Sequence, residues 1–302
     1  MKKSIILIAC FCLTFTIVSG QSKTVEKLKE YEKTLRTIDA QSINGENELE
    51  RRNSTYNFIK TLVTALKLPG SYNYPFDSLK TIAITKDPEN KFRIFSWLFA
   101  NDDGTYRYYG AIQMNNPKQL ELYPLKDYTD FINNLSDTIT SNENWVGAQY
   151  YQIIPPSNSN DPYLLLGWKG NDQKSSMRVI EPLTISEGKI TMGAPVLQDS
   201  TGKHLNRMVF EYSKSASMML KYIPSKKWIV FDHLVPSDKS KTGHYEYYGP
   251  DLSYDGLKYE KGKWVYMNNI NLTNEASVAD ELFNDPKKLA NPQGTPAKRG
   301  KN

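Results

Sequence analysis

The sequence predicts a mainly β protein, an antiparallel meander preceded by an α-helical hairpin. Helical spacing of apolar residues is confined to the first 70 positions, whereas the later chain is a series of short alternating segments separated by turn sequences. The composition agrees, because 20 Tyr, 11 Phe and 5 Trp residues suit side chains that stand on half-buried sheets. The meander can close as a barrel, stack as a sandwich or form propeller-like blades.

Residues 1–20 have the three parts of a secretory signal peptide. Lys2 and Lys3 supply a positive start, an uncharged apolar run extends from Ile5 to Val18, and the segment closes at Gly20. The apolar run is shorter than the roughly 20 residues that a membrane-spanning helix needs, so we expect cleavage. The protein is then secreted across the inner membrane and is periplasmic or envelope-associated, with no transmembrane span after cleavage.

Both cysteines of the chain, Cys10 and Cys12, lie inside this segment. The tetrapeptide Leu7–Cys10 also resembles the lipobox of bacterial lipoproteins, which leaves lipidation of Cys10 open. A cleaved signal gives a cysteine-free mature chain, which excludes disulfides, thiolate nucleophiles and cysteine metal ligands. We expect no cofactor.

Residues 21–70 are expected to form the helical hairpin. Apolar residues recur every three or four positions between Thr24 and Ile38, and again from about Glu46 to Lys67. The dipeptide Pro69-Gly70 ends the second helix. Each amphipathic helix must bury its apolar stripe against the other or against the sheets that follow.

Residues 71–275 are expected to form the β-rich domain. The segment Phe92–Ala100 is informative, because Phe92 and Ile94 point to one face of a strand while Phe95 and Trp97 point to the other. Both faces are apolar, so this strand should be covered on both sides. The other strands are expected near residues 79–86, 106–114, 119–124, 145–154, 163–169, 177–185, 189–196, 208–213, 218–223, 228–235, 257–260 and 264–268.

The charge is concentrated at the two ends of the chain. The formal net charge is +5, but two lysines lie in the signal and five cations against one acid follow from Asp285 onward. The body between them is close to neutral, which argues against nucleic-acid binding. Residues 276–302 lack apolar residues to bury near their end and are expected to be a disordered basic tail.

Several stretches resemble an uncharacterised family of exported bacterial proteins of the Gram-negative envelope. They are residues 95–99 (Phe-Ser-Trp-Leu-Phe), 103–114, 165–171, 210–218, 229–234 (Ile-Val-Phe-Asp-His-Leu) and 247–257. The resemblance covers most of the β region and none of the helical hairpin. It implies a setting outside the cytoplasm and carries no activity, partner or site residue.

Three residues are candidates for catalysis. Asp232 and His233 are neighbours in an apolar strand, so their side chains should point to opposite faces and serve separately. Glu211 is a further candidate. A glycan hydrolase would need two facing carboxylates, from among Asp232, Glu211, Glu181 and Asp251.

Two further patterns suggest binding. Asp251, Ser253 and Asp255 place oxygen ligands at the spacing of a calcium loop, although the flanking strands exclude an EF-hand and we expect no metal site. The alternative is a Gly-Pro turn followed by an Asp-Gly hairpin. Aromatic residues form the second pattern, a surface on which a sugar or peptide can stack: Trp168, Tyr245, Tyr247 and Tyr248.

Three functions fit these patterns. The first is an exported, non-catalytic β-scaffold that binds a glycan, a peptide or an envelope partner protein, because no complete catalytic constellation is visible. The second is the carboxylate-dependent glycan hydrolase. The third is structural packing through the helical hairpin, which predicts an exposed apolar stripe at four leucines: Leu28, Leu35, Leu62 and Leu66.

Overall fold

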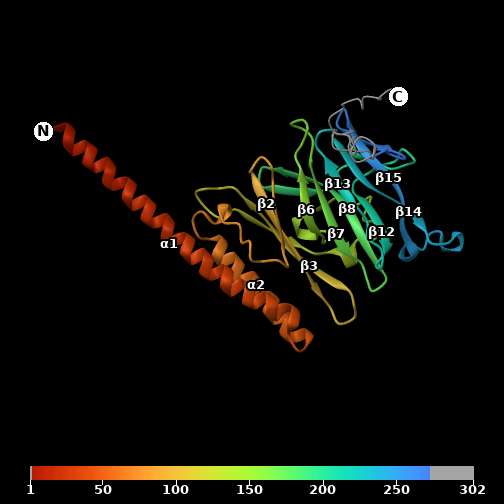
Figure 1. The fold of residues 1–302 in the computed structure, drawn as a ribbon, viewed down its shortest axis with the longest axis horizontal. Coiled ribbons are helices and arrows are strands. Elements are labelled where there is room, and N and C mark those ends of the chain that lie inside the picture. The colour runs from red at the N-terminus through yellow and green to blue at the C-terminus, as the bar shows by residue number, and fades with distance from the viewer. Residues whose placement is uncertain (1, 273–302) are drawn as a thin grey trace, which may run out of the picture.

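The computed structural model describes residues 2–272, with side chains from residue 23 onward. The predicted tail, residues 276–302, lies outside this range. Helix α1 (Lys2–Asn44) runs without a break through residue 20 and pairs over its second half with α2 (Glu48–Leu66), while its first half extends beyond the sheets (Figure 1). Asn47 caps α2 by accepting a hydrogen bond from the backbone of Glu50 at 3.0 Å. Within the described range, no helix combines the length and apolarity that a membrane span requires.

The predicted exposed stripe on the hairpin is wrong. Leu28, Leu35, Leu62 and Leu66 are all buried, in a core that the two helices share with Phe95 and Trp97 of the first sheet. An amphipathic hairpin that lies beside an apolar sheet face buries its own apolar side chains against that face. These leucines are therefore not available for contact with another protein.

The first sheet has the order β1-β2-β3-β4. Its strands are β1 (Ala83–Lys86), β2 (Phe92–Ala100), β3 (Tyr106–Met114) and β4 (Leu122–Lys126), and all neighbours are antiparallel. The prediction that β2 is covered on both sides is confirmed, since Phe95 and Trp97 pack on the helices while Phe92 and Ile94 pack on the second sheet.

The second sheet has the order β5-β9-β8-β7-β6. Its strands are β5 (Thr140–Ser141), β6 (Gln149–Ile154), β7 (Tyr163–Gly170), β8 (Ser175–Ser186) and β9 (Lys189–Met192). A further strand, β12 (Met208–Ser213), pairs with the first half of β8, on the edge that β9 occupies farther along.

The third sheet has the order β11-β10-β16-β15-β14-β13. Its strands are β10 (Leu197–Gln198), β11 (His204–Leu205), β13 (Leu220–Ile223), β14 (Trp228–Pro236), β15 (Tyr248–Glu260) and β16 (Lys263–Met267). The short β10–β11 hairpin comes from the chain between β9 and β12, and Leu197 pairs with Trp264 of β16 in parallel.

The molecule is a stack of four layers: hairpin, first sheet, second sheet and third sheet (Figure 1). One hydrophobic core fills each of the three interfaces. In the described part of the chain, strands hold 41% of the residues and helices 22%, so the prediction of a mainly β fold with a helical hairpin in front is confirmed. Among the described residues the sheets are open and form no closed barrel, which removes the barrel from the predicted alternatives.

Candidate functional site

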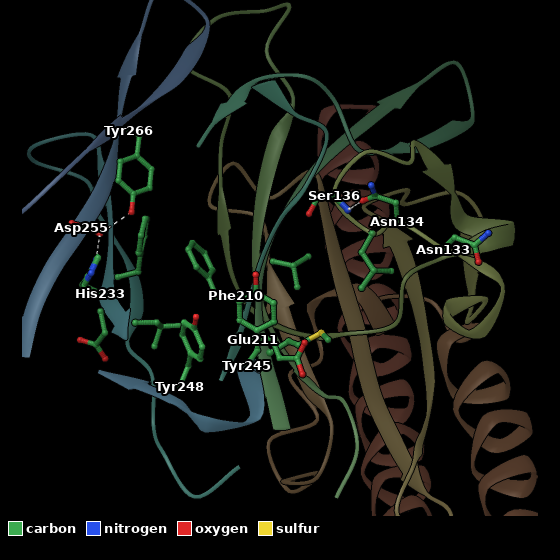
Figure 2. Close-up of a pocket in the computed structure, with 16 residues that line it drawn as sticks. Asn133, Asn134, Ser136, Phe210, Glu211, His233, Tyr245, Tyr248, Asp255 and Tyr266 are labelled. Atoms are coloured by element: carbon green, nitrogen blue, oxygen red, sulfur yellow. Dashed lines mark hydrogen bonds and ion pairs between the residues drawn. The ribbon is translucent and has the colours of Figure 1, made fainter. Parts of the chain in front are cut away.

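A cleft of about 620 Å³ lies between the second and third sheets, beside β12 (Figure 2). We call it the β12 cleft. Its lining comes from the loop before β5, from β8 and β12, from β14, from the short helix η5 (Tyr245–Tyr247), and from β15 and β16. The lining residues are Asn133, Asn134, Leu135, Ser136, Met177, Val209, Phe210, Glu211, Phe231, Asp232, His233, Leu234, Tyr245, Tyr248, Asp255 and Tyr266.

The chemistry of this lining is aromatic and acidic. Five of the lining residues are aromatic, and Glu211, Asp232 and Asp255 bring three carboxylates. None of the lining residues is a lysine or an arginine, so the cleft suits an uncharged or a cationic occupant.

His233, Asp255 and Tyr266 form a connected group in the left part of Figure 2. Nδ1 of His233 lies 2.6 Å from Oδ2 of Asp255, and the Tyr266 hydroxyl donates to the same oxygen at 2.7 Å. The backbone N–H of Asn269 donates to Oδ1 at 2.8 Å. Burial alone would raise the pKa of Asp255, but these three hydrogen bonds outweigh it and hold that pKa below its usual value.

This arrangement leaves one nitrogen of His233 available. An ionised carboxylate only accepts hydrogen bonds, so the Nδ1 facing Asp255 carries a proton. In the neutral ring Nε2 is then an acceptor, and 43% of the His233 side chain is exposed against 4% for Asp255. The group can therefore accept a hydrogen bond or a proton from a molecule in the cleft.

The strand register brings the two residues together. Asp255 pairs with Phe231 across β14 and β15, and His233 follows Phe231 on the same face. The register shifts between Asp232 and Leu234, because β15 carries extra residues around Leu252 opposite this point of β14. The partner of His233 is therefore 22 positions away in sequence.

Glu211 and Asp232 line the same cleft but are held by uncharged donors. Oε1 of Glu211 accepts from the Ser175 hydroxyl at 2.6 Å and from Asn171 at 3.3 Å. Oδ2 of Asp232 accepts from the backbone N–H of Met219 at 2.7 Å. Neither carboxylate has an ion pair within the described residues, so no cation in contact balances either one.

A buried ion pair anchors the loop that forms the far wall. Arg207 and Glu181 are both fully buried, with Nη2 of the guanidinium 2.5 Å from Oε1 of the carboxylate. Arg207 also donates to the carbonyl oxygens of Leu135 and Thr138, and its backbone N–H donates to Ser136 at 3.1 Å. Glu181 is thereby committed to the core and lies outside the cleft.

The four aromatic residues predicted to form one binding surface lie in different places. Tyr245 and Tyr248 line the cleft with ring centroids 5.0 Å apart, whereas Tyr247 is outside the lining and contacts the Lys241 ammonium group through its ring. Trp168 lies outside the cleft lining and contacts Tyr106, so the predicted aromatic surface is divided between two places.

The structure shows neither the calcium loop considered for Asp251, Ser253 and Asp255 nor the turn-and-hairpin alternative. Asp251, Ser253 and Asp255 lie within one long strand, β15. Asp251 binds the backbone and hydroxyl of Ser253, while Asp255 faces His233 and Tyr266. No group of three or more acidic, His or Cys side chains able to hold a metal occurs in the described part of the chain.

Comparison with known proteins gives no relative: no protein-family model matches the chain, and neither a curated protein nor a solved structure is similar to it. The functional argument therefore rests on the β12 cleft itself.

Proposed function

We propose that this is an exported protein of the cell envelope that binds a ligand in the β12 cleft without transforming it. The ligand classes under consideration are a glycan, a peptide and a segment of a partner protein. The observation that carries the proposal is the lining of the cleft, in which five aromatic side chains meet three carboxylates without a lysine or an arginine. Aromatic faces supply contact area, and a few polar groups fix the orientation of what binds.

The test is a pull-down from envelope extract together with a glycan panel, both on the purified chain. The double variant Tyr245→Ala, Tyr248→Ala removes the paired rings of the cleft. The matched control is Tyr56→Ala on α2, since Tyr56 is 47% exposed and Tyr245 is 50% exposed. We expect the double variant to lose at least tenfold in affinity for whatever is retained and the control to lose none. Absence of any retained molecule in both assays would contradict the proposal.

A second candidate function is carboxylate-dependent hydrolysis of glycans. It is favoured by the presence of Glu211 and Asp232 in one cleft with the His233–Asp255 pair. A glycosidase needs one carboxyl group as acid and a second as base or nucleophile. Glu211→Gln and Asp232→Asn keep the side-chain shapes, so hydrolysis should fall by at least a hundredfold in each while glycan binding persists. The rate of hydrolysis is measured as the release of new reducing ends from envelope glycans. Equal release by both variants and the parent chain would exclude this function.

A further inference from the structure

The free edge of β12 carries unpaired backbone groups. β12 pairs with β8 from Met208 to Ser213, and no other described strand pairs with it. In an antiparallel ladder, alternate residues turn their N–H and C=O groups toward the partner strand and the others turn them away. The backbone N–H of Lys214, one position beyond the strand, donates to the carbonyl oxygen of Lys174 at 2.8 Å. Counting back by twos from this bonded pair, Phe210 and Tyr212 face β8.

Val209 and Glu211 therefore direct their N–H and C=O groups away from β8. No hydrogen bond to these four groups exists among the described residues. Both residues line the β12 cleft, so the unpaired edge opens into it. In Figure 2, Glu211 lies between the Asn133–Ser136 wall on one side and the His233 group on the other.

The first sheet shows how an edge is normally protected. Its edge strand β4 has Pro124 in the centre, and a proline cannot donate a ladder hydrogen bond. Exposed edges without such protection recruit other strands. β12 has no proline, and its edge is shielded only by the walls of the cleft.

Charge indicates which chain fits. Glu211 lies on the unpaired edge itself, and its carboxylate is held only by the neutral donors Ser175 and Asn171. Asp232 adds a second unpaired carboxylate in the lining. A chain with basic side chains at alternate positions would place cations beside these acids, whereas an acidic chain would be repelled.

We propose that the β12 cleft binds an extended peptide segment carrying lysine or arginine, which adds to the second sheet as a strand beside β12. The N–H and C=O groups of Val209 and Glu211 pair with the backbone of the peptide, and Glu211 and Asp232 select its basic side chains. This rests on the proposed binding function and names its ligand.

The probe is a fluorescent eight-residue peptide of alternating threonine and lysine, compared with a threonine–glutamate peptide and with a lysine peptide methylated on alternate backbone nitrogens. Fluorescence anisotropy with the full chain measures the affinities. We expect the lysine peptide to bind at least tenfold more tightly than either of the others. Equal affinity for the methylated and unmethylated lysine peptides would overturn strand addition.

Substitutions in the protein, rather than in the peptide, also test the free edge of β12. Val209→Pro removes an N–H that the ladder with β8 does not use, and an edge strand tolerates such a proline. Val209→Thr, which keeps the N–H, is the matched control. We expect a loss of at least tenfold for the proline variant and none for the threonine variant, with circular dichroism verifying the fold of both. Glu211→Gln should reduce the preference for lysine over glutamate peptides.

The glycan panel separates the two proposals. A glycan whose binding needs Tyr245 and Tyr248 but is unchanged by Val209→Pro, together with no peptide binding, would overturn strand addition and sustain the binding function. Failure to bind either class would overturn both.

Discussion

Lys169 places its ammonium group in the interior without a carboxylate in contact. Nζ donates to the Thr129 hydroxyl and to the Gly147 carbonyl, each at 3.1 Å, and lies 4.3 Å from the centroid of the Tyr108 ring. Burial lowers the pKa of this lysine to about 8, although the more distant Asp127 opposes the shift. The folded protein therefore holds the charged form less favourably than the unfolded chain does.

This shift predicts a pH dependence of stability with a definite sign. Between pH 8 and about 10.5 the unfolded chain keeps the Lys169 proton more than the folded protein does, so the free energy of unfolding should rise with pH. The slope contributed by one such group is at most about 1.4 kcal/mol per pH unit. Urea denaturation of the parent chain and Lys169→Met at pH 7.5 and 9.5 measures it. The variant should gain less stability over this interval, and equal gains would contradict the assignment.

The Glu181–Arg207 pair predicts strong coupling between two substitutions. Glu181→Leu leaves a buried guanidinium without its partner and should lower the free energy of unfolding by about 3–5 kcal/mol. Glu181→Leu combined with Arg207→Met removes the uncompensated charge, so the double variant should be more stable than Glu181→Leu alone. Urea denaturation of the parent, both single variants and the double variant measures the coupling. Additive losses would show that the two charges do not interact.

At the candidate site, sequence reasoning identified single residues but not their partnerships. Asp232, His233, Glu211, Tyr245 and Tyr248 were all expected from the sequence as site residues, and the structure places all five in one cleft. The link between His233 and Asp255 could not be predicted, because it depends on the register of β14 against β15. Asp255 was considered only as a calcium-loop candidate, because Asp251, Ser253 and Asp255 have the spacing of oxygen ligands in such a loop.

At the scale of single elements, β15 shows where turn signals mislead. Its sequence contains Gly249-Pro250 and Asp255-Gly256, which are typical of turns, yet the strand continues from Tyr248 to Glu260. Gly256 has a different role. A Cβ at this position would lie 2.6 Å from the carbonyl oxygen of Ile229 and 2.4 Å from Cδ1 of Ile270. The glycine permits close approach of the chain on either side, a reason that no local pattern reveals.

Substitution of two glycines of β15 by alanine should therefore have different effects on the stability of the protein. Gly256→Ala forces the backbone of Ile229 or the side chain of Ile270 to move and should destabilise the protein by about 1–3 kcal/mol. Gly249→Ala is the control, because its Cβ would meet only the Ala216 methyl group at 3.7 Å. Thermal and urea denaturation measure both. A Gly256→Ala variant as stable as Gly249→Ala would show that the contact relaxes freely.

The strands with strong alternation were predictable because their pattern is local. The limits of β2, β3 and β12 match the predicted segments residue for residue. The two-residue strands β5, β10 and β11 were missed, since two residues cannot express a period. β5 and β10 form because they pair with β9 and β16, which are distant in the sequence, and β11 forms by pairing with β10.

For the whole molecule, the order of the layers predicts the distribution of stability. The second sheet is covered on both faces, by the first sheet on one side and the third on the other. Amides of β7 and β8 should therefore exchange with solvent only through global unfolding, whereas amides of α1 and α2 should also exchange by local opening. Hydrogen exchange followed by mass spectrometry measures both. Helix amides as slow as those of β8 would show that the stack opens as one unit.

The layer order itself was only partly predictable. The two apolar faces of β2 indicated a covered sheet, but nothing local distinguished a sandwich from a propeller. The order also includes a crossing of β10 into the third sheet, which depends on contacts distant in sequence: the backbone N–H of Trp264 donates to the Val196 carbonyl at 2.8 Å, and Nζ of Lys263 donates to the Pro195 carbonyl at 2.7 Å.

That crossing has a consequence for dividing the chain. Each layer is otherwise made from one continuous piece, which would suggest that the protein can be shortened one layer at a time. The β10–β11 hairpin prevents it, because a fragment ending at Ser213 carries strands whose partner, β16, belongs to the missing part. If the chain is cut at the turn that follows Ser213, each piece holds one side of the interface between the second and third sheets, and the third sheet itself is divided between two strands in the first piece and four in the second. They are complementary fragments rather than independent modules, so a functional version of this protein divided in two must be expressed as a pair.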